Sequence, residues 1–309
     1  MVSGEENGRQ IAFLDTQKAA MLDFNCLNLK KVALALKRIG IFYNPLSQGA
    51  FTLAEEVKRF LGEKGVTAWL NSVREKDEAI AQLEGTELII SIGGDGTILR
   101  ASQVVVPKQI PILGVNLGRL GFMTELGPDE VLEKLPALLS GEGWIDERSM
   151  LEVELPLESD LKRFYALNDV VVGRGSIARL VYVEASIDDK PLTTYRADGV
   201  LVATATGSTG YSLAAGGPIL HPQASEFLLL PLLPHLSSAY PLVLPSDSVV
   251  RLRISTGHEA VATIDGHVSL ALPNDTLLTV KISSNKARFL RIHPADSFYA
   301  TLEQKLRGR

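Results

Sequence analysis

A glycine-rich turn that carries one carboxylate is the part of the chain whose residue types best suit chemistry. Gly93, Gly94 and Gly96 surround Asp95, and Thr97 follows them. Glycines let backbone N–H groups approach a phosphate without a Cβ atom in the way. A helix that starts after the turn would add the positive end of its dipole, which favours anions. Gly93, Gly94, Gly96 and Thr97 are therefore predicted to form a phosphate-binding loop.

Asp95 is electrostatically awkward beside a phosphate unless it has a task. It would orient or deprotonate a hydroxyl that attacks the phosphate, or help to hold Mg²⁺. An N-cap of the following helix is the purely structural alternative, and the spacing alone leaves both open. The turn fits neither G-x-x-x-x-G-K-[ST] nor G-x-G-x-x-G, the two common phosphate loops.

A second polar stretch follows an apolar segment in the later half of the chain. Asp198 opens this segment, and residues 206–212 then supply a dense run of hydroxyls and glycines. Hydroxyls and backbone amides suit ribose or phosphate oxygens, and the ring of Tyr211 is suited to stacking on a base. A Ser/Thr helix cap with a core tyrosine is the alternative for any one residue. The density of such residues favours a wall that binds a ligand.

Two adjacent polar residues, Asn168 and Asp169, interrupt an apolar segment that spans 164–172. Burying such side chains is costly unless they are paired. A turn with local side-chain hydrogen bonds is one explanation. A pair that recognises an adenine edge or ribose hydroxyls is the other.

The five histidines are scattered and give neither H-x-x-x-H nor H-E-x-x-H, so we expect no metal site built from protein ligands alone. His267 follows Asp265-Gly266, which is predicted to be a hairpin turn between two strands. On the sequence alone, an exposed turn histidine is the favoured interpretation of His267.

Composition excludes several classes of protein. The net charge of -5 gives no electrostatic signal for nucleic acid or acidic membranes. No apolar run reaches the roughly 18 residues that span a bilayer, and the single cysteine, Cys26, fits a reducing compartment. The N-terminus has no continuous apolar core typical of a signal peptide. We therefore expect a cytoplasmic protein without nucleic-acid or membrane partners.

The elements that would position these residues alternate in type over the first half of the chain. Short apolar runs predict strands and periodic segments predict helices, with the helix at 50–64 burying Phe51, Ala54, Val57, Phe60 and Leu61 on one face. The expected strands are 38–43, 66–70, 87–92 and 110–116, and the expected helices are 50–64, 76–83, 97–106 and 128–139. Ligands in such parallel sheets bind beyond the carboxyl ends of the strands, where Asp95 and Asn116 fall.

Alternation with period two replaces this pattern after about residue 146, which predicts half-buried antiparallel strands. The expected fold is α/β plus β, with a Rossmann-like parallel α/β N-terminal domain and a β-sandwich-like C-terminal domain. The expected division has an N-terminal extension at 1–37, an α/β domain at 38–145 to which 286–309 return, and a β-rich domain at 146–285.

The blocks together resemble the NAD kinase family, most specifically over 91–97, 114–124, 168–173 and 196–218. Diacylglycerol and sphingosine kinases share the first block, but not the second stretch or the Asn168-Asp169 pair. The resemblance implies transfer of the terminal phosphate of ATP to the adenosine-ribose 2′-hydroxyl of NAD, giving NADP. Asp95 would be the catalytic carboxylate. The alternatives are a lipid kinase with the same loop and a non-catalytic NAD(P) sensor.

The resemblance also implies which residues bind NAD. Phe122 would line the nicotinamide-side or adenine pocket, and Arg196 and Asp198 would approach the nicotinamide ribose, partly from a neighbouring subunit. The residues implied to bind NAD are Asp95, Gly96, Phe122, Asn168, Asp169, Arg196, Asp198, Thr206, Thr209, Gly210, Tyr211, Ser212 and His267.

Mg²⁺, or another divalent cation, would arrive with ATP, and the resemblance implies a homodimer or homotetramer. Many family members have alanine where Gly210 stands and glutamate where Asp169 stands. Both differences keep the type of chemistry, although Gly210 is more flexible and Asp169 is shorter.

Overall fold

The computed structural model describes residues 36–118, 121–157, 160–175, 179–235, 240–294 and 298–307. Most of the predicted N-terminal extension and the Arg119-Leu120 part of the third sequence block lie outside these ranges.

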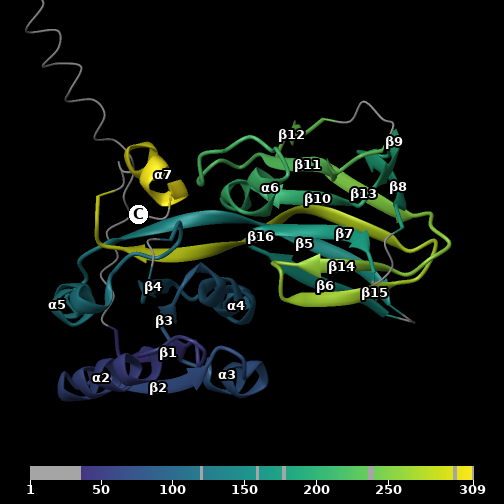
Figure 1. Ribbon diagram of the computed structural model, residues 1–309. Coiled ribbons are helices and arrows are strands. Elements are labelled where there is room, and N and C mark those ends of the chain that lie inside the picture. The colour runs from purple at the N-terminus through teal and green to yellow at the C-terminus, as the bar shows by residue number, and fades with distance from the viewer. Residues whose placement is uncertain are drawn as a thin grey trace, which may run out of the picture.

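The first half of the chain forms a parallel sheet with helices on both faces (Figure 1). Its strands are β1 (Arg38–Tyr43), β2 (Thr67–Ser72), β3 (Leu88–Gly93) and β4 (Ile112–Asn116). Its helices are α2 (Ala50–Glu63), α3 (Lys76–Gln82), α4 (Asp95–Val105), the 3-10 turn η2 (Val106–Lys108) and α5 (Pro128–Leu139). Every residue of β3 is buried, as expected for a central parallel strand covered on both faces.

The second half is antiparallel and packs as two layers. Its strands are β5 (Trp144–Leu157), β6 (Asp160–Ala166), β7 (Asp169–Arg174), β8 (Val181–Ile187), β9 (Lys190–Ala197), β10 (Gly199–Thr204), β11 (Phe227–Leu232), β12 (Leu242–Leu244), β13 (Val249–Ile254), β14 (Ala260–Ile264), β15 (Val268–Leu272) and β16 (Leu277–Arg291). A six-stranded sheet, ordered β12-β11-β10-β7-β14-β15, faces β13, β8, β9 and parts of β5 and β16 across one apolar core. The sandwich-like C-terminal half predicted from the alternation is confirmed.

One sheet runs through both halves of the molecule. β16 pairs in parallel with β4 through Phe289 and Ile112, and it pairs antiparallel with β13 and with β5. The resulting ten-stranded sheet has the order β2-β1-β3-β4-β16-β13-β8-β9, with β5 and β6 joined to it through β16. The predicted boundary at 145/146 falls inside β5, so the division into domains stays a prediction.

Helix α2 shows where the predicted helical face was wrong. Val57 and Leu61 are buried as expected, but Phe51 is 53% exposed and contacts Tyr43 edge to face. The buried face instead includes Ala50 and Leu53, because the first turn of α2 faces the sheet with its small residues.

The C-terminal helix α7 (Phe298–Arg307) lies across β5 and β16 from β4 in Figure 1. The assignment of 286–309 to the first domain stays a prediction. Lys305 lies over the ring of Phe122, which places α7 beside the loop that follows β4.

Candidate functional site

Asp95 is the first residue of α4 and is held by the loop after β4. Its Oδ2 accepts a hydrogen bond from the backbone N–H of Phe122 at 2.8 Å, and its Oδ1 accepts one from that of Met123 at 3.1 Å. Its carboxylate makes no side-chain hydrogen bond to its own helix, since α4 has no side-chain cap. A Cβ atom on Gly121 would lie closer than 3.0 Å to the carboxylate, so the loop passes Asp95 where only glycine fits.

The glycine-rich loop is shaped by close approach on one side and is open on the other. A Cβ atom on Gly93 would lie closer than 3.0 Å to Thr97 Oγ1, whereas Cβ atoms on Gly94 and Gly96 would meet nothing within 4 Å. Thr97 Oγ1 is buried and has no hydrogen-bond partner in the described part of the chain. The helix begins at Asp95, two residues before the predicted start, so the N–H groups of its first turn belong to this loop.

A cavity of about 470 Å³ lies against the open side of the loop. Arg74 and Arg100 line it together with His267 and the backbone of Gly94 and Gly96. Arg100 makes no ion pair with any residue that the structure describes, so its positive charge is available to an anion.

Asn168 and Asp169 form the start of β7 and are fixed by a carboxylate that the sequence prediction missed. Asp265 accepts backbone N–H groups from Leu167 at 2.9 Å, Asn168 at 2.7 Å and Asp169 at 3.2 Å. Asp265 is 6% exposed and sits in the β14–β15 hairpin turn that the sequence did predict. It was interpreted only as a turn residue because Asp-Gly is so common in such turns.

Two buried carboxylates therefore lie next to each other. Burial, and then the charge of Asp265, raises the pKa of Asp169 to about 7. Burial also raises the pKa of Asp265, although its three backbone N–H donors act in the opposite direction. Asp169 makes no side-chain hydrogen bond to a described residue, so it is the member of the pair that is suited to hold a proton.

Stability is expected to depend on pH through Asp169. Its folded pKa of about 7 lies above the ordinary value of 3.8, so the stability that its protonation contributes is lost as the pH rises through 7. Asp169→Asn removes that loss, and the gain in thermal midpoint relative to wild type should be larger at pH 8 than at pH 5. Asp129→Asn, at an exposed position on α5, is the matched control and should show no such difference. Equal shifts for Asp169→Asn at both pH values would contradict the assignment.

The residues after β10 form the opposite wall, as the 3-10 turn η3 (Thr206–Thr209) and the single-turn helix α6 (Tyr211–Ala214). Thr206 Oγ1 and Ser212 Oγ are buried without a hydrogen-bond partner among the described residues, as is Asn168 Oδ1. Thr209 Oγ1 donates to the carbonyl oxygen of Thr206 at 3.2 Å. A Cβ atom on Gly210 would lie 3.5 Å from the side-chain amide nitrogen of Asn168. Tyr211 is half exposed and lines the cavity that Asn168 and Asp169 also line.

Three neighbouring cavities share lining residues, and together they are called the groove. The loop cavity shares Asp265 and Gly266 with the Asn168 cavity, which shares Tyr211 and Thr263 with a third cavity lined by Asp198. His267 lines the loop cavity, and it is half-buried rather than fully exposed as the sequence favoured. The groove thus brings together half of the predicted residues, from both halves of the chain: Gly94, Gly96, Thr97, Asn168, Asp169, Asp198, Tyr211 and His267.

The other predicted residues line none of these three cavities: Gly93, Asp95, Phe122, Arg196, Thr206, Thr209, Gly210 and Ser212. Arg196 is exposed, lines none of these cavities, and places its guanidinium 5.7 Å from the centre of the Tyr182 ring. Phe122 lines a separate cavity, which neither Asn168 nor Tyr211 lines. Asp198 pairs with Arg174 at 3.3 Å in the third cavity.

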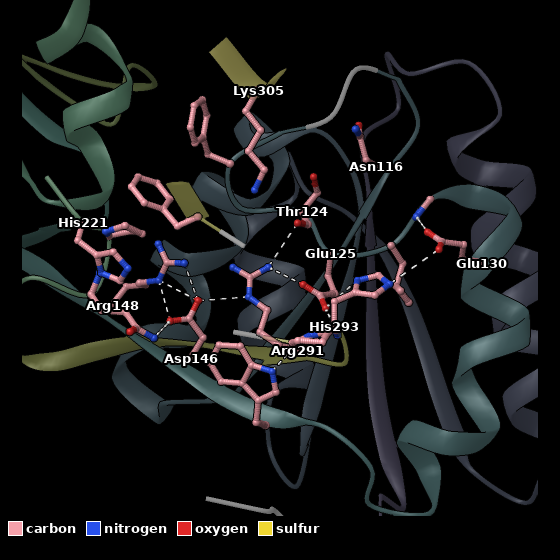
Figure 2. Close-up of a pocket in the computed structure, with 18 of the residues that line it drawn as sticks. Asn116, Thr124, Glu125, Glu130, Asp146, Arg148, His221, Arg291, His293 and Lys305 are labelled. Carbon is pink, nitrogen blue, oxygen red and sulfur yellow. Dashed lines mark hydrogen bonds and ion pairs between the residues drawn. The ribbon is translucent and has the colours of Figure 1, made fainter. Parts of the chain in front are cut away.

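The separate cavity measures about 520 Å³ and contains charged residues that the sequence prediction did not single out (Figure 2). Asp146 binds Arg148 at 2.6 Å and Arg291 at 3.2 Å, and Glu125 binds Arg291 at 3.1 Å. Burial raises the pKa of Asp146, but the hydrogen bond and charge of Arg148, then the charge of Arg291, outweigh it and hold that pKa below its usual range. Asp146 and Arg148 near the start of β5 meet Arg291 at the end of β16 because the two strands pair there.

Within the ranges that the structure describes, no cluster of three or more histidine, cysteine, aspartate or glutamate side chains is arranged to hold a metal ion. Among the same residues, no helix has the length and apolar character needed to cross a membrane.

Comparisons with known proteins agree with the arrangement of the two halves. A family profile described as "ATP-NAD kinase N-terminal domain" matches residues 39–143, and one described as "ATP-NAD kinase C-terminal domain" matches residues 167–292. An NAD kinase of Dehalococcoides mccartyi is 47% identical over 274 residues, which cover 88% of this chain and 96% of that protein. An NAD kinase of Chloroflexus aurantiacus is 41% identical over 273 residues, covering 88% of this chain and 99% of that one.

Two solved structures share the fold. The crystal structure of an NAD kinase from Archaeoglobus fulgidus in complex with ATP has a TM-score of 0.71 and 26% identity, covering 88% of this chain and 99% of that one. The crystal structure of yeast NADH kinase complexed with NADH has a TM-score of 0.78 at 23% identity, covering 90% of this chain and 88% of that one.

Proposed function

The chain belongs to the NAD kinase family and transfers phosphate from ATP to NAD, and we propose that the groove beside Asp95 holds the NAD. The observation that carries this proposal is a set of buried polar atoms without partners among the described residues, in Asn168, which lines the groove, and in the η3 and α6 segments that follow β10. Thr206 Oγ1, Ser212 Oγ and Asn168 Oδ1 each incur a desolvation cost unless a ligand bonds to them.

The adenosine half of NAD is proposed to lie between β7 and η3. Asn168 and Asp169 would recognise the adenine edge, and Thr206 and Thr209 would bind ribose hydroxyls. Tyr211 is suited to stacking on the base. Asp198 would approach the nicotinamide ribose, and Arg196, which lies outside the groove, would serve the site of a neighbouring subunit. A homodimer or homotetramer is therefore part of the proposal.

Asp95 is proposed to act on the adenosine-ribose 2′-hydroxyl. Its carboxylate would orient this hydroxyl and accept its proton while the 2′-oxygen attacks the terminal phosphorus of ATP. The bond from that phosphorus to the bridging oxygen breaks, and ADP leaves. The two backbone N–H groups that bind Asp95 hold the carboxylate in one orientation, so catalysis is mostly positioning.

The glycine-rich loop is proposed to receive the terminal phosphate. The open sides of Gly94 and Gly96, the free charge of Arg100 and the unpartnered Thr97 Oγ1 support this role. A divalent cation would arrive with ATP, held by its phosphate oxygens. When bound, Mg²⁺ would neutralise charge on the transferred phosphoryl group. We also propose that the protein works in the cytoplasm.

One assay separates this function from its alternatives. Purified protein with Mg²⁺, ATP and NAD is expected to form NADP, measured with an NADP-specific dehydrogenase. Transfer to diacylglycerol without transfer to NAD would favour a lipid kinase, and tight NAD binding without ATP consumption would favour a sensor. Repeating the assay with polyphosphate and with NADH defines the donor and the acceptor.

A further inference from the structure

Helix α4 bonds to other segments through two side chains, one near each of its ends. At its first residue, Asp95 accepts two backbone N–H groups from the loop after β4. About two turns further along, the side-chain amide of Gln103 donates to the carbonyl oxygen of Tyr165 at 3.3 Å and to Asp265 Oδ2 at 3.5 Å. Within the described part of the chain, no other side chain of α4 makes a hydrogen bond to a segment outside the helix.

Both acceptors of Gln103 flank the turn that is proposed to bind adenosine. Tyr165 lies near the end of β6, shortly before this turn, and Asp265 accepts the backbone N–H groups of Asn168 and Asp169 within it. Figure 1 shows α4 beside β6 and β14, in agreement with these bonds. Gln103 therefore joins the helix that carries Asp95 to the proposed adenosine site.

Gln103 itself lines none of the three cavities of the groove, whereas Asp265 lines two of them. An effect of Gln103 on the reaction must therefore pass through the groups to which it bonds.

The charge of Asp265 depends on such donors. Its side chain is buried and forms no ion pair with a described residue, so N–H groups compensate its charge. Three of these groups belong to the backbone of the 167–169 turn, and Gln103 supplies one from the first half of the chain. The carboxylate thus attracts both the turn and α4, and it holds them against each other.

The geometry of α4 makes it a spacer of fixed length. Asp95, Leu99 and Gln103 follow one another at intervals of four residues, which places them on one side of the helix, and Leu99 lines the loop cavity. The buried residues Ile98, Ala101, Val104 and Val105 attach the helix to the apolar core of the first half. A rise of about 1.5 Å per residue puts Asp95 and Gln103 about 12 Å apart along the axis.

We propose that Gln103 is a positioning residue for the phosphoryl transfer, which fixes the Asp95 carboxylate relative to the ribose hydroxyl of bound NAD. The inference rests on the proposed function and adds to it a residue that touches neither substrate. Without the amide, α4 and the Asn168 turn each keep their own contacts but shift relative to each other. Misalignment of reacting groups lowers the rate of the chemical step more than it lowers binding.

The test is Gln103→Met, which removes both donors and keeps the length and helix propensity of the side chain. Both bonds of Gln103 are long for hydrogen bonds, so kcat is expected to fall about 5–30-fold. The KM values for NAD and ATP should change less than about threefold, because Asp265 still holds Asn168 and Asp169 through their backbone N–H groups. Gln304→Met makes the same chemical change at an exposed position on α7 and should leave kcat and both KM values unchanged.

Two further variants separate positioning from a general effect on folding. Gln103→Arg keeps N–H donors for both acceptors and is expected to retain kcat within about threefold of wild type. Gln103→Glu places a second carboxylate against Asp265, and its kcat is expected to fall below that of Gln103→Met. The expected order of kcat is therefore wild type, Gln103→Arg, Gln103→Met and Gln103→Glu. The order of the arginine and glutamate variants tests the inference even if Gln103→Met does not fold.

Three results would overturn the inference: wild-type kcat in Gln103→Met, a rise in the KM for NAD that matches the loss of kcat, or equal losses in the arginine and glutamate variants. A lower thermal midpoint with unchanged kcat in Gln103→Met would likewise leave Gln103 with a structural role alone. Failure of the wild type to form NADP would overturn the proposed function itself, so the two failures are distinguishable.

Discussion

Asp95→Asn is expected to lower kcat by about 10²–10⁴-fold while the fold and the binding of NAD are retained. The amide cannot take the proton of the 2′-hydroxyl. It can still accept one of the two backbone N–H groups, from Phe122 or Met123, that the carboxylate accepts now. The loop is therefore expected to stay close to its present position, and the loss should appear in kcat more than in the KM for NAD. Steady-state kinetics with an NADP-specific readout, together with calorimetric binding of NAD, measures both.

Asp129→Asn is the matched control for this variant, because it makes the same chemical change on the exposed first turn of α5. Wild-type kcat in Asp95→Asn would remove the catalytic role from Asp95. A loss of NAD binding equal to the loss of kcat would instead show that the main role of Asp95 is to position the Phe122 loop.

Gly207→Ala is expected to lower kcat/KM for NAD by about 10²-fold, because it displaces Asn168, which is proposed to bind the adenosine half of NAD. A Cβ atom on Gly207 would lie closer than 3.0 Å to three backbone atoms of Asn168, and backbone cannot yield as a flexible side chain does. The Asn168 turn must shift, and it would strain the hydrogen bonds that Asp265 accepts from it. We expect a loss of about 1–3 kcal/mol in the free energy of unfolding as well, measured by urea denaturation.

Gly210→Ala is the control for Gly207→Ala. Its Cβ atom would approach the Gly207 carbonyl oxygen to 3.3 Å, a tight contact that a small adjustment relieves. Near-normal kinetics are therefore expected. Equal effects of the two substitutions would contradict the structural distinction between the two glycines.

Local sequence was sufficient to predict the parts of the site whose geometry is local. The glycine-rich loop and the β14–β15 turn each depend on residues within a few positions of one another. Their structures match the predictions, apart from helix α4, which begins two residues early at Asp95. Whether Asp95 and the groove residues perform the roles assigned to them stays a prediction.

Contacts between segments that are distant in the sequence could not be predicted from local sequence patterns. Asp265 is nearly 100 residues from the three N–H groups that it accepts, and its Asp-Gly neighbours explained it adequately as a turn. Lys305 belongs to the C-terminal helix, and only the fold brings its ammonium group over the ring of Phe122, more than 180 residues earlier in the chain. Helical periodicity alone predicts that Phe51 is in the core. Periodicity does not distinguish a side chain that packs on the sheet from one that, like Phe51, contacts a single ring, that of Tyr43.

The long strands β5 and β16 have a mechanical consequence. Because both run without a break from one half of the molecule to the other, the halves cannot swing apart as two rigid bodies without tearing a ladder of hydrogen bonds. Opening and closing around substrates must then come from twisting of this shared ribbon, or from the segments that lie on it. The register of the ribbon shifts between Ile282 and Lys286, where fewer rungs resist torsion. That short interval is where the ribbon is expected to twist most readily.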